Sequence, residues 1–359
     1  MKRFGSILIV LTLIGALPII IINYWVDPLQ FYRKATNYPA AFYKDQRFQN
    51  PGLAKNYEYN AVLLGTSMAE NYLMDEMDSL FAKQFLKLTM SGSSLHEQNK
   101  LLELAISTGK VQDVFWAVES YTLNAEADKL VNDDFYQFPN YLYDQNPLTD
   151  FFYLFNPILF KRSIAILNNS IYREIEDPND IGYWGGDETQ FGTDKVMEFQ
   201  NNAEMRRQAE DFIGISENNS FENGKENIDE NVIEVIKREP SIFFVFIFSP
   251  PSILFHLNRF ETEDYELQLK LKEYFVRSVS QYPNARIFDF EAVEDISSNL
   301  DLYKDLVHYS PKVNSRILKD IVANKNRVDS SSIGMKIEQL NQQLENFKID
   351  KERDGEKRE

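Results

Sequence analysis

The sequence contains no cysteine among its 359 residues and only three histidines, His96, His256 and His308. Without cysteine the chain has no disulfide framework, no thiol nucleophile and no cysteine-ligated zinc. Three scattered histidines also form no recognisable pattern of metal ligands. We therefore expect neither a metal nor another cofactor.

Positive charge is scarce as well. Against 55 Asp and Glu there are only 38 Lys and Arg, which gives a formal net charge of −17. Proteins hold nucleic-acid backbones mainly through clustered Lys and Arg, and no such cluster stands out here. We therefore expect no nucleic-acid partner.

Apolar residues are concentrated at the N-terminus, where the 22 residues Gly5–Val26 carry no charge. A helix needs roughly 20 such residues to cross a bilayer, and Tyr24 and Trp25 would lie at the far interface. A cleavable signal peptide is the alternative, but its apolar core is shorter and ends in a small-residue site that is missing after Trp25. The sequence predicts an uncleaved single-pass anchor at residues 1–26, with the rest of the chain outside the cytoplasm.

Short apolar runs alternate with amphipathic stretches in the rest of the chain. Their length and their β-branched and aromatic content favour strands, at 61–64, 85–90, 114–118, 242–248 and 286–290. Helical spacing of apolar residues predicts helices at 95–107, 263–279 and 311–322. This alternation indicates an α/β fold with a five-stranded parallel sheet covered by helices on both faces.

Composition divides the chain after the anchor into three parts. Residues 27–57 are expected to form an extracytoplasmic linker, residues 58–325 the α/β domain and residues 326–359 a polar, charged tail that begins with a short amphipathic helix. Residues 125–235 break the strand–helix rhythm and are rich in Tyr, Phe, Asn and Asp. We interpret them as an insertion over the carboxyl end of the sheet, where open α/β sheets bind ligands. Their aromatic residues suit sugar binding or simply pack together as a cap.

The stretch "AVLLGTSMAE", residues 61–70, places Ser67 where a buried strand is expected to end and a helix to begin. Serine is favoured at helix N-caps, which is one explanation for its presence. The other is a nucleophile at a helix N-terminus, where N–H groups and the helix dipole favour negative charge. The local sequence alone leaves both explanations open.

Asp305 and His308, in "YKDLVHYSPKVN", are three residues apart, so that in a turn their side chains can meet. A carboxylate next to a histidine fixes its tautomer and stabilises the imidazolium that forms when it accepts a proton. An isolated pair of this kind is also compatible with a solvated loop. Ser310 and Pro311 then predict the start of the last helix.

A second turn, "TMSGSSLHEQ", follows the second expected strand. Because neighbouring parallel strands end at the same edge of a sheet, Gly92 is placed to offer its backbone N–H to an oxyanion near Ser67. Ser94 and Glu97 have the spacing of a capping box for the next helix. His96 lies within that first turn, and we expect it to be a surface or structural residue.

Together, "GTS" with Ser67, Gly92 after the second strand and Asp305-x-x-His308 before the last helix resemble the SGNH (GDSL-like) hydrolase superfamily, in the same order along the chain. The resemblance covers roughly residues 58–325 and implies a three-layer α/β/α sandwich. It also implies that Ser67 is the nucleophile, His308 the general base and Asp305 its orienting partner. The oxyanion donors would be the backbone N–H groups of Ser67 and Gly92.

Two positions depart from the superfamily's pattern. Thr66 replaces the aspartate of Gly-Asp-Ser, and the third block, normally an asparagine after the third strand, reads "VESYTLN". Asn124 is the candidate for the displaced oxyanion donor. Losing one such donor costs on the order of 10²–10³ in rate.

With the predicted anchor, the resemblance extends to membrane-anchored cell-envelope branches, the DltD-like proteins of teichoic acid D-alanylation and the exopolysaccharide O-acetyltransferases. It implies an O-acyl esterase or acyltransferase that acts on an acylated cell-surface polysaccharide or teichoic-type polymer, with a membrane-bound acyltransferase as a further partner. One alternative is a catalytically silent domain that binds glycan or scaffolds such an acyltransferase. Another is a structural envelope protein, which would require Asp305 and His308 to lie far from Ser67.

Overall fold

The computed structural model describes residues 15–132, 137–170, 175, 177–205 and 220–356. They belong to two compact units. The N-terminal unit comprises the chain up to residue 58 with residues 100–110 and 132–181, and the sheet unit comprises residues 59–99, 111–131 and the chain from residue 182 onward. The predicted insertion at residues 125–235 thus contributes to both units, and its residues 133–136, 171–174, 176 and 206–219 lie outside the described residues.

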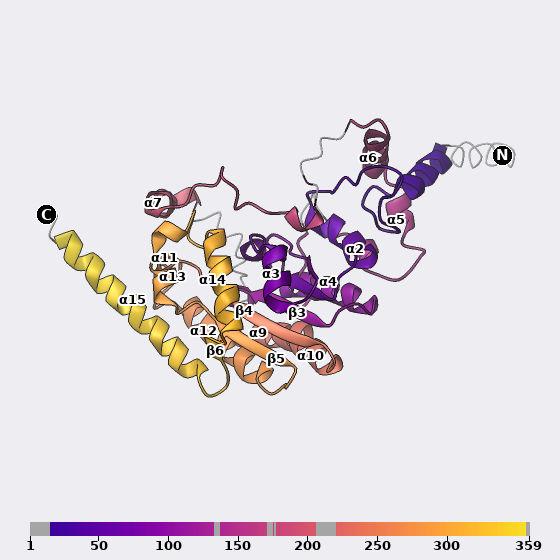
Figure 1. Cartoon of the computed structure of the whole chain (residues 1–359). Coiled ribbons are helices and arrows are strands. Elements are labelled where there is room, and N and C mark those ends of the chain that lie inside the picture. The colour runs from indigo at the N-terminus through magenta and orange to yellow at the C-terminus, as the bar shows by residue number, and fades with distance from the viewer. Residues whose placement is uncertain (1–14, 133–136, 171–174, 176, 206–219, 357–359) are drawn as a thin grey trace, which may run out of the picture. The chain divides into compact units, whose positions relative to one another are not determined.

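A six-stranded sheet in the order β2-β1-β3-β4-β5-β6 forms the centre of the sheet unit (Figure 1). Its strands are β1 (Ala61–Leu64), β2 (Phe85–Lys87), β3 (Asp113–Val118), β4 (Phe243–Phe248), β5 (Ala285–Asp289) and β6 (Arg327–Val328). The first five are parallel, and β6 is antiparallel to β5. The predicted five-stranded, wholly parallel sheet is therefore wrong. Two residues of β6 are too few to produce a periodic apolar pattern.

The helices of the chain vary widely in length. In the N-terminal unit these are a helix at residues 15–26, α2 (Gln46–Asn56), α5 (Phe151–Leu154) and α6 (Pro157–Leu167). Helix α4 (Leu95–Ser107) begins in the sheet unit, which also contains α3 (Met74–Phe81), α7 (Thr193–Asn201), α9 (Phe221–Ile228), α10 (Glu234–Arg238), α11 (Ile253–Leu257), α12 (Glu263–Val279), α13 (Glu294–Ser297), α14 (Pro311–Val322) and α15 (Ile333–Glu356). Single 3₁₀ turns lie at Ser67–Ala69, Ser120–Thr122, Asn140–Leu142, Pro178–Asp180 and Leu300–Leu302, and a π-helical turn at Asp229–Ile233 joins α9 to α10. The predicted helices at 95–107, 263–279 and 311–322 are confirmed as α4, α12 and α14.

Helices cover both faces of the sheet, because successive strand residues point to opposite sides. On one face Phe115 of β3 belongs to a core that includes Met77 of α3 and Ile317 of α14. On the other face Phe246 of β4 packs edge-on against Phe275 of α12, with ring centroids 5.2 Å apart. Fully burying each such side chain contributes about 1.5–3 kcal/mol.

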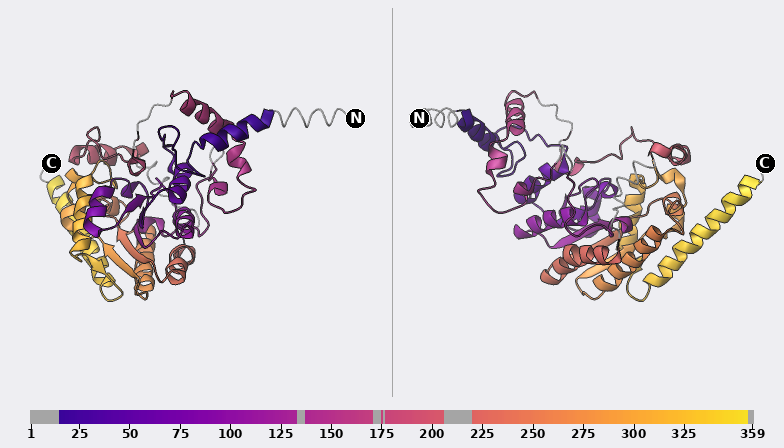
Figure 2. Two further views of the ribbon diagram at one scale, coloured as in Figure 1. Left: turned by 45° about the vertical axis from the view of Figure 1, so that its right-hand side comes forward. Right: turned by 180° about the vertical axis from the view of Figure 1, so that it is seen from behind.

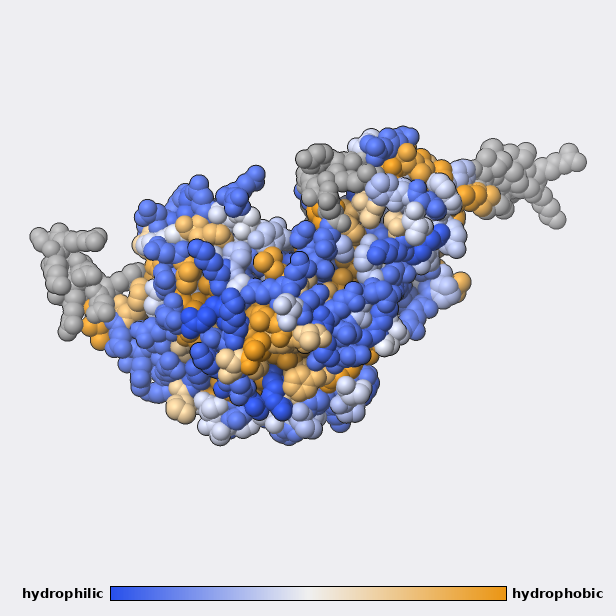
Figure 3. All heavy atoms as spheres, in the orientation of Figure 1, coloured by the Kyte–Doolittle hydropathy of each residue, from blue (hydrophilic) through white to orange (hydrophobic). Residues whose placement is uncertain are grey.

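Helix α15 extends the sheet unit beyond α14. Leu340 and Leu344 of this helix are fully buried in the core of the unit, and α15 runs alongside α11 and α12 (Figure 2). The segment predicted as a polar tail thus contains a packed helix. The face of the molecule drawn in Figure 3 is mostly hydrophilic, with smaller hydrophobic groups between the polar residues.

Asp27 organises the start of the segment that was predicted as a linker. Its carboxylate accepts hydrogen bonds from the backbone N–H groups of Phe31, Tyr32 and Arg33 at 2.8–2.9 Å and from the Tyr153 hydroxyl at 2.6 Å. Burial raises the pKa of this carboxyl group. These bonds tie residues 27–33 to α5 within the N-terminal unit.

The prediction of a single-pass membrane protein is contradicted. Across the described ranges no helix combines the length and the apolar character that crossing a bilayer requires. The part of the predicted anchor that is described, residues 15–26, is helical. Residues 5–14 of that prediction lie outside the described residues.

Candidate active site

A sharp corner follows β1 and is possible only with glycine. Gly65 has φ +149°, and a Cβ on it would lie 2.8 Å from the Cβ of Ala69 and 3.0 Å from that of Ala117. Such separations are well below van der Waals contact. Gly65 therefore lets the chain turn closely past β3 and brings Ser67 out at the carboxyl edge of the sheet.

Ser67 begins a single 3₁₀ turn, Ser67–Ala69, and not the longer helix that the sequence predicts at this point. Thr66 caps the turn, with its hydroxyl accepting from the N–H of Met68 at 3.4 Å. The next α-helix, α3, begins only at Met74. The helix-dipole argument for Ser67 is therefore corrected, because so short a turn has little macrodipole.

Ser67, His308 and Asp305 form one hydrogen-bonded chain. Ser67 Oγ lies 2.8 Å from His308 Nε2, and His308 Nδ1 lies 2.8 Å from Asp305 Oδ2. The side chains of His308 and Asp305 are 20% and 17% exposed, which leaves the group accessible from solvent. The structure thus brings together Ser67 and His308, which are separated by 241 positions in the sequence, and the large distance that the envelope-protein alternative requires between them is not observed.

Asp305 is held by its own loop as well as by His308. Its Oδ1 accepts from the backbone N–H groups of Val307 at 2.9 Å and His308 at 2.8 Å. Burial by itself would raise the pKa of the Asp305 carboxyl, but the hydrogen bond and charge of His308, with these N–H groups, lower it below its ordinary value. An ionised Asp305 accepts a hydrogen bond from the Nδ1–H of His308, which leaves Nε2 as the acceptor for the Ser67 hydroxyl.

Gly92 lies in a turn that is joined to the Ser67 corner by the backbone. Beyond the end of β2 the N–H of Met90 donates to the carbonyl of Gly65 at 2.9 Å, so that the two loops continue side by side. Gly92, with φ +60°, follows two residues later. Asn124 is buried in the segment after β3. Their roles as oxyanion donors stay predictions.

The two positions that depart from the motif pattern contact each other. The Thr66 hydroxyl donates to Glu119 Oε1 at 3.0 Å, and Glu119 follows β3 directly. Burial raises the pKa of Glu119 to about 8, with the charge of Glu291 adding to the effect and the Thr66 hydrogen bond opposing it. At neutral pH this carboxyl group is therefore largely protonated, and it holds Thr66, the residue directly before Ser67, by a hydrogen bond.

Trp184 is a residue of this site that sequence reasoning missed. Its indole Nε1–H donates to the carbonyl of Ser67 at 3.0 Å, and its ring packs edge-on against His308 with centroids 5.2 Å apart. It belongs to the aromatic stretch "IGYWGGDETQFGTD", residues 181–194. Its position between Tyr183 and two glycines was the only available signal, because nothing in the local pattern links it to residues 67 and 308.

The other two histidines are structural. His96 Nδ1 lies 3.1 Å from Asn231 Oδ1, as expected of a surface or structural residue. His256 is fully buried in α11, where burial, with the positive charges of Lys272 and Arg259, lowers its pKa to about 3. In the part of the chain that the structure describes, no group of three or more His, Asp or Glu side chains is arranged to hold a metal ion.

The predicted capping box is confirmed. The N–H of Glu97 donates to Ser94 Oγ at 3.1 Å, and the Glu97 carboxylate accepts from the N–H of Ser94 at 3.2 Å. These two residues therefore begin α4 and do no chemistry in this arrangement.

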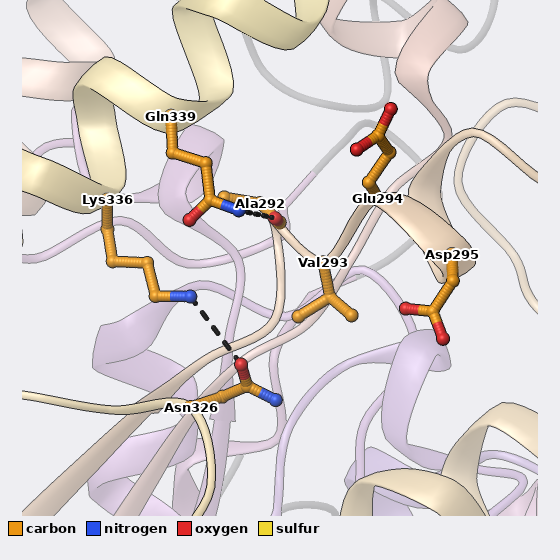
Figure 4. Close-up of a pocket in the computed structure, with 7 residues that line it drawn as sticks. All are labelled: Ala292, Val293, Glu294, Asp295, Asn326, Lys336 and Gln339. Atoms are coloured by element: carbon orange, nitrogen blue, oxygen red, sulfur yellow. Dashed lines mark hydrogen bonds between the residues drawn. The ribbon is translucent and has the colours of Figure 1, made fainter.

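A surface cavity of about 450 Å³ lies elsewhere in the sheet unit, between α15, α13 and the loop after β5 (Figure 4). It is lined by Ala292, Val293, Glu294, Asp295, Asn326, Lys336 and Gln339. Gln339 donates to the carbonyl of Ala292 at 3.2 Å, and Lys336 lies 3.5 Å from Asn326 Oδ1. These polar groups satisfy one another, and the cavity contains no member of the Ser67–His308–Asp305 chain.

Comparison with known proteins leaves function to be argued from this site. No family model and no curated protein matches the chain. Among solved structures it is similar to one from Streptococcus pneumonia that is described as a candidate platelet activating factor, with 12% sequence identity and a TM-score of 0.39 over 77% of this chain and 91% of that chain. A likeness at this level says nothing about the activity of this chain.

Proposed function

We propose that the chain is a serine-dependent O-acyl ester hydrolase or acyltransferase in which Ser67 is the nucleophile, His308 the general base and Asp305 the carboxylate that orients it. The observation that carries this proposal is the continuous chain of 2.8 Å contacts from Ser67 Oγ through the His308 imidazole to Asp305. Nucleophile, base and orienting group within hydrogen-bond reach are the signature of covalent catalysis.

In the proposed reaction Ser67 Oγ attacks the acyl carbonyl while its proton passes to His308 Nε2. The tetrahedral intermediate collapses as the bond to the leaving alkoxide breaks, and the imidazolium returns the proton to that oxygen. Water or a sugar hydroxyl then attacks the acyl-serine, giving its proton to His308, and Ser67 recovers a proton as the acyl group departs. Exclusion of water from the site decides whether hydrolysis or transfer results.

An O-acylated glycan or teichoic-type polymer is the proposed substrate class. The resemblance of the motif residues suggests it, and Trp184 next to His308 supports it, because an indole ring offers a sugar a flat apolar face. The competing proposal, a silent domain that binds such a polymer, shares this aromatic surface but requires no reactive serine.

A fluorophosphonate probe separates the two proposals. Attack by Ser67 Oγ forms a P–O bond and expels fluoride, so intact mass spectrometry should find one covalent adduct on the wild-type protein. Ser67→Ala and His308→Ala should each abolish it. Ser280→Ala, at the end of α12 beside the start of β5, is the matched control and should label normally. Unchanged labelling of Ser67→Ala would refute the nucleophile assignment, and no labelling of the wild type would favour the silent domain.

A further inference from the structure

Trp184 is fixed in place from three directions. Its backbone N–H donates to Asn71 Oδ1 at 3.1 Å, and its indole N–H donates to the Ser67 carbonyl at 3.0 Å. The following residue, Gly185, lies so close to α14 that a Cβ on it would be 2.3 Å from Cγ of Pro311. These contacts hold the indole in one orientation next to the His308 imidazole.

The side chain of Lys304 lies over the Trp184 ring. Its Nζ is 3.7 Å from the centroid of the Trp184 ring, a cation–π arrangement. The loop positions it through the backbone N–H of Lys304, which donates to the carbonyl of His308 at 3.0 Å. The two centroid distances, 3.7 Å from Nζ to the indole and 5.2 Å from the indole to the imidazole, together keep Nζ within about 9 Å of the His308 ring.

The ammonium group of Lys304 has donors to spare. An ammonium carries three N–H groups, and in the described part of the chain Nζ contacts the indole face and forms no ion pair. Burial lowers the pKa of Lys304, and the negative charges of Asp305 and Glu70 oppose this effect through space.

We propose that Lys304 and Trp184 form a subsite for an anionic group of the ester substrate, a carboxylate or a phosphate, bound by an ammonium group that lies within about 9 Å of the His308 imidazole. This inference rests on the proposed function and adds the charge of the substrate to it. The indole contributes an apolar face for the part of the substrate that joins the anion to the ester. The cation offsets the repulsion that so acidic a protein exerts on an anionic substrate.

Matched esters test the subsite. 4-Acetoxybenzoate and 4-acetoxybenzamide differ in one negative charge para to the scissile acetate. Lys304→Met should lower kcat/KM for 4-acetoxybenzoate about fivefold to tenfold, the range for a single hydrogen bond that stays partly exposed to water, and change that for 4-acetoxybenzamide less than twofold. Lys304→Arg should retain most of the benzoate activity. Lys237→Met, in α10 at the opposite edge of the sheet, removes the same charge and should change neither ester. 4-Acetoxyphenyl phosphate is measured in parallel. Lys304→Met should lower kcat/KM by the larger factor for whichever anion, phosphate or carboxylate, the subsite favours.

Binding to catalytically dead protein keeps the test independent of the proposed reaction. In a Ser67→Ala background, titration with 4-acetoxybenzoate is followed by tryptophan fluorescence. The Kd should be about fivefold to tenfold lower for Ser67→Ala than for Ser67→Ala/Lys304→Met, and the Kd for 4-acetoxybenzamide should be the same for both proteins. Equal losses on both esters, or benzoate binding that does not depend on Lys304, would overturn the subsite. If the wild-type protein cleaves neither ester but binds benzoate through Lys304, the proposed function fails and the subsite stands.

Discussion

At the scale of single residues, the chain next to Ser67 is held by a hydrogen bond to a buried carboxyl group, that of Glu119. Glu119 accepts the Thr66 hydroxyl, and its pKa of about 8 lies well above the ordinary value of 4.5. The folded protein therefore holds a proton on this group between about pH 4.5 and pH 8, whereas the unfolded chain releases it. Linkage requires the contribution of Glu119 to the free energy of unfolding to fall as pH rises through this window, whereas His256, with its lowered pKa, contributes in the opposite direction below about pH 6.5.

Glu119→Gln should flatten that pH dependence, because an amide of the same shape keeps a carbonyl for Thr66 and does not titrate. The measurement is urea unfolding at several values between pH 5 and pH 8, with the slope of free energy against pH compared between proteins. Glu226→Gln, an exposed position in α9, should keep the wild-type slope. An equally steep slope in Glu119→Gln would show that Glu119 is ionised throughout.

At the scale of elements, α12 is joined to the carboxyl end of β5 by buried charges. Lys272 Nζ lies 2.7 Å from both Asp289 and Glu291, and all three side chains are at most 2% exposed. Glu291 also accepts from the Ser120 hydroxyl at 2.6 Å, which extends the cluster to the turn after β3. Lys272 is thus the counter-charge for two buried carboxylates. Burial alone would lower the pKa of Lys272, but the attraction of Asp289 and Glu291 raises it above its ordinary value.

Lys272→Met should lower the free energy of unfolding by about 3–5 kcal/mol, since it leaves buried carboxylates without a counter-charge. Lys270→Met is the matched control on the same helix. Lys270 is 65% exposed and 3.7 Å from Glu266, and exposed pairs of this kind contribute about 0–1 kcal/mol. Chemical denaturation of the two variants checks the prediction, and similar losses in both would contradict it.

At the scale of the whole molecule, the net charge of −17 is the dominant electrostatic feature. Like charges repel one another in the compact state more than in the extended chain. The ion pairs at the surface recover only part of this free energy, because each contributes little. Stability should therefore depend on ionic strength.

Raising NaCl from about 20 mM to about 300 mM shortens the Debye length from roughly 20 Å to below 6 Å and should raise Tm at pH 7. Differential scanning calorimetry measures the change, and the rise should shrink near pH 5, where net charge falls towards the sequence pI of about 4.8. A Tm that falls with salt at pH 7 would show that attractive pairs outweigh the net repulsion.

Much of the sheet unit was predictable because local patterns carry its elements. The apolar runs ended within a few residues of the strands, and α4, α12 and α14 matched their predicted bounds, since amphipathic spacing is a local property. The order of motifs also pointed to Ser67, Asp305 and His308. The uncharged N-terminal run predicted a spanning helix, and the described part of the chain contains none, because composition alone does not establish such a helix.

Ser67 at a tight corner after β1, and the Asp305–His308 pair in one loop, are therefore what the sequence by itself determined. Tertiary structure alone decided that Ser67 begins a 3₁₀ turn, that Thr66 meets Glu119, and that Trp184 and Lys304 lie next to the imidazole. The physical reason is the distance along the sequence over which each kind of interaction acts. Strand and helix periodicity act over a few residues, whereas these contacts join loops brought together only when parallel strands end at the same edge of the sheet.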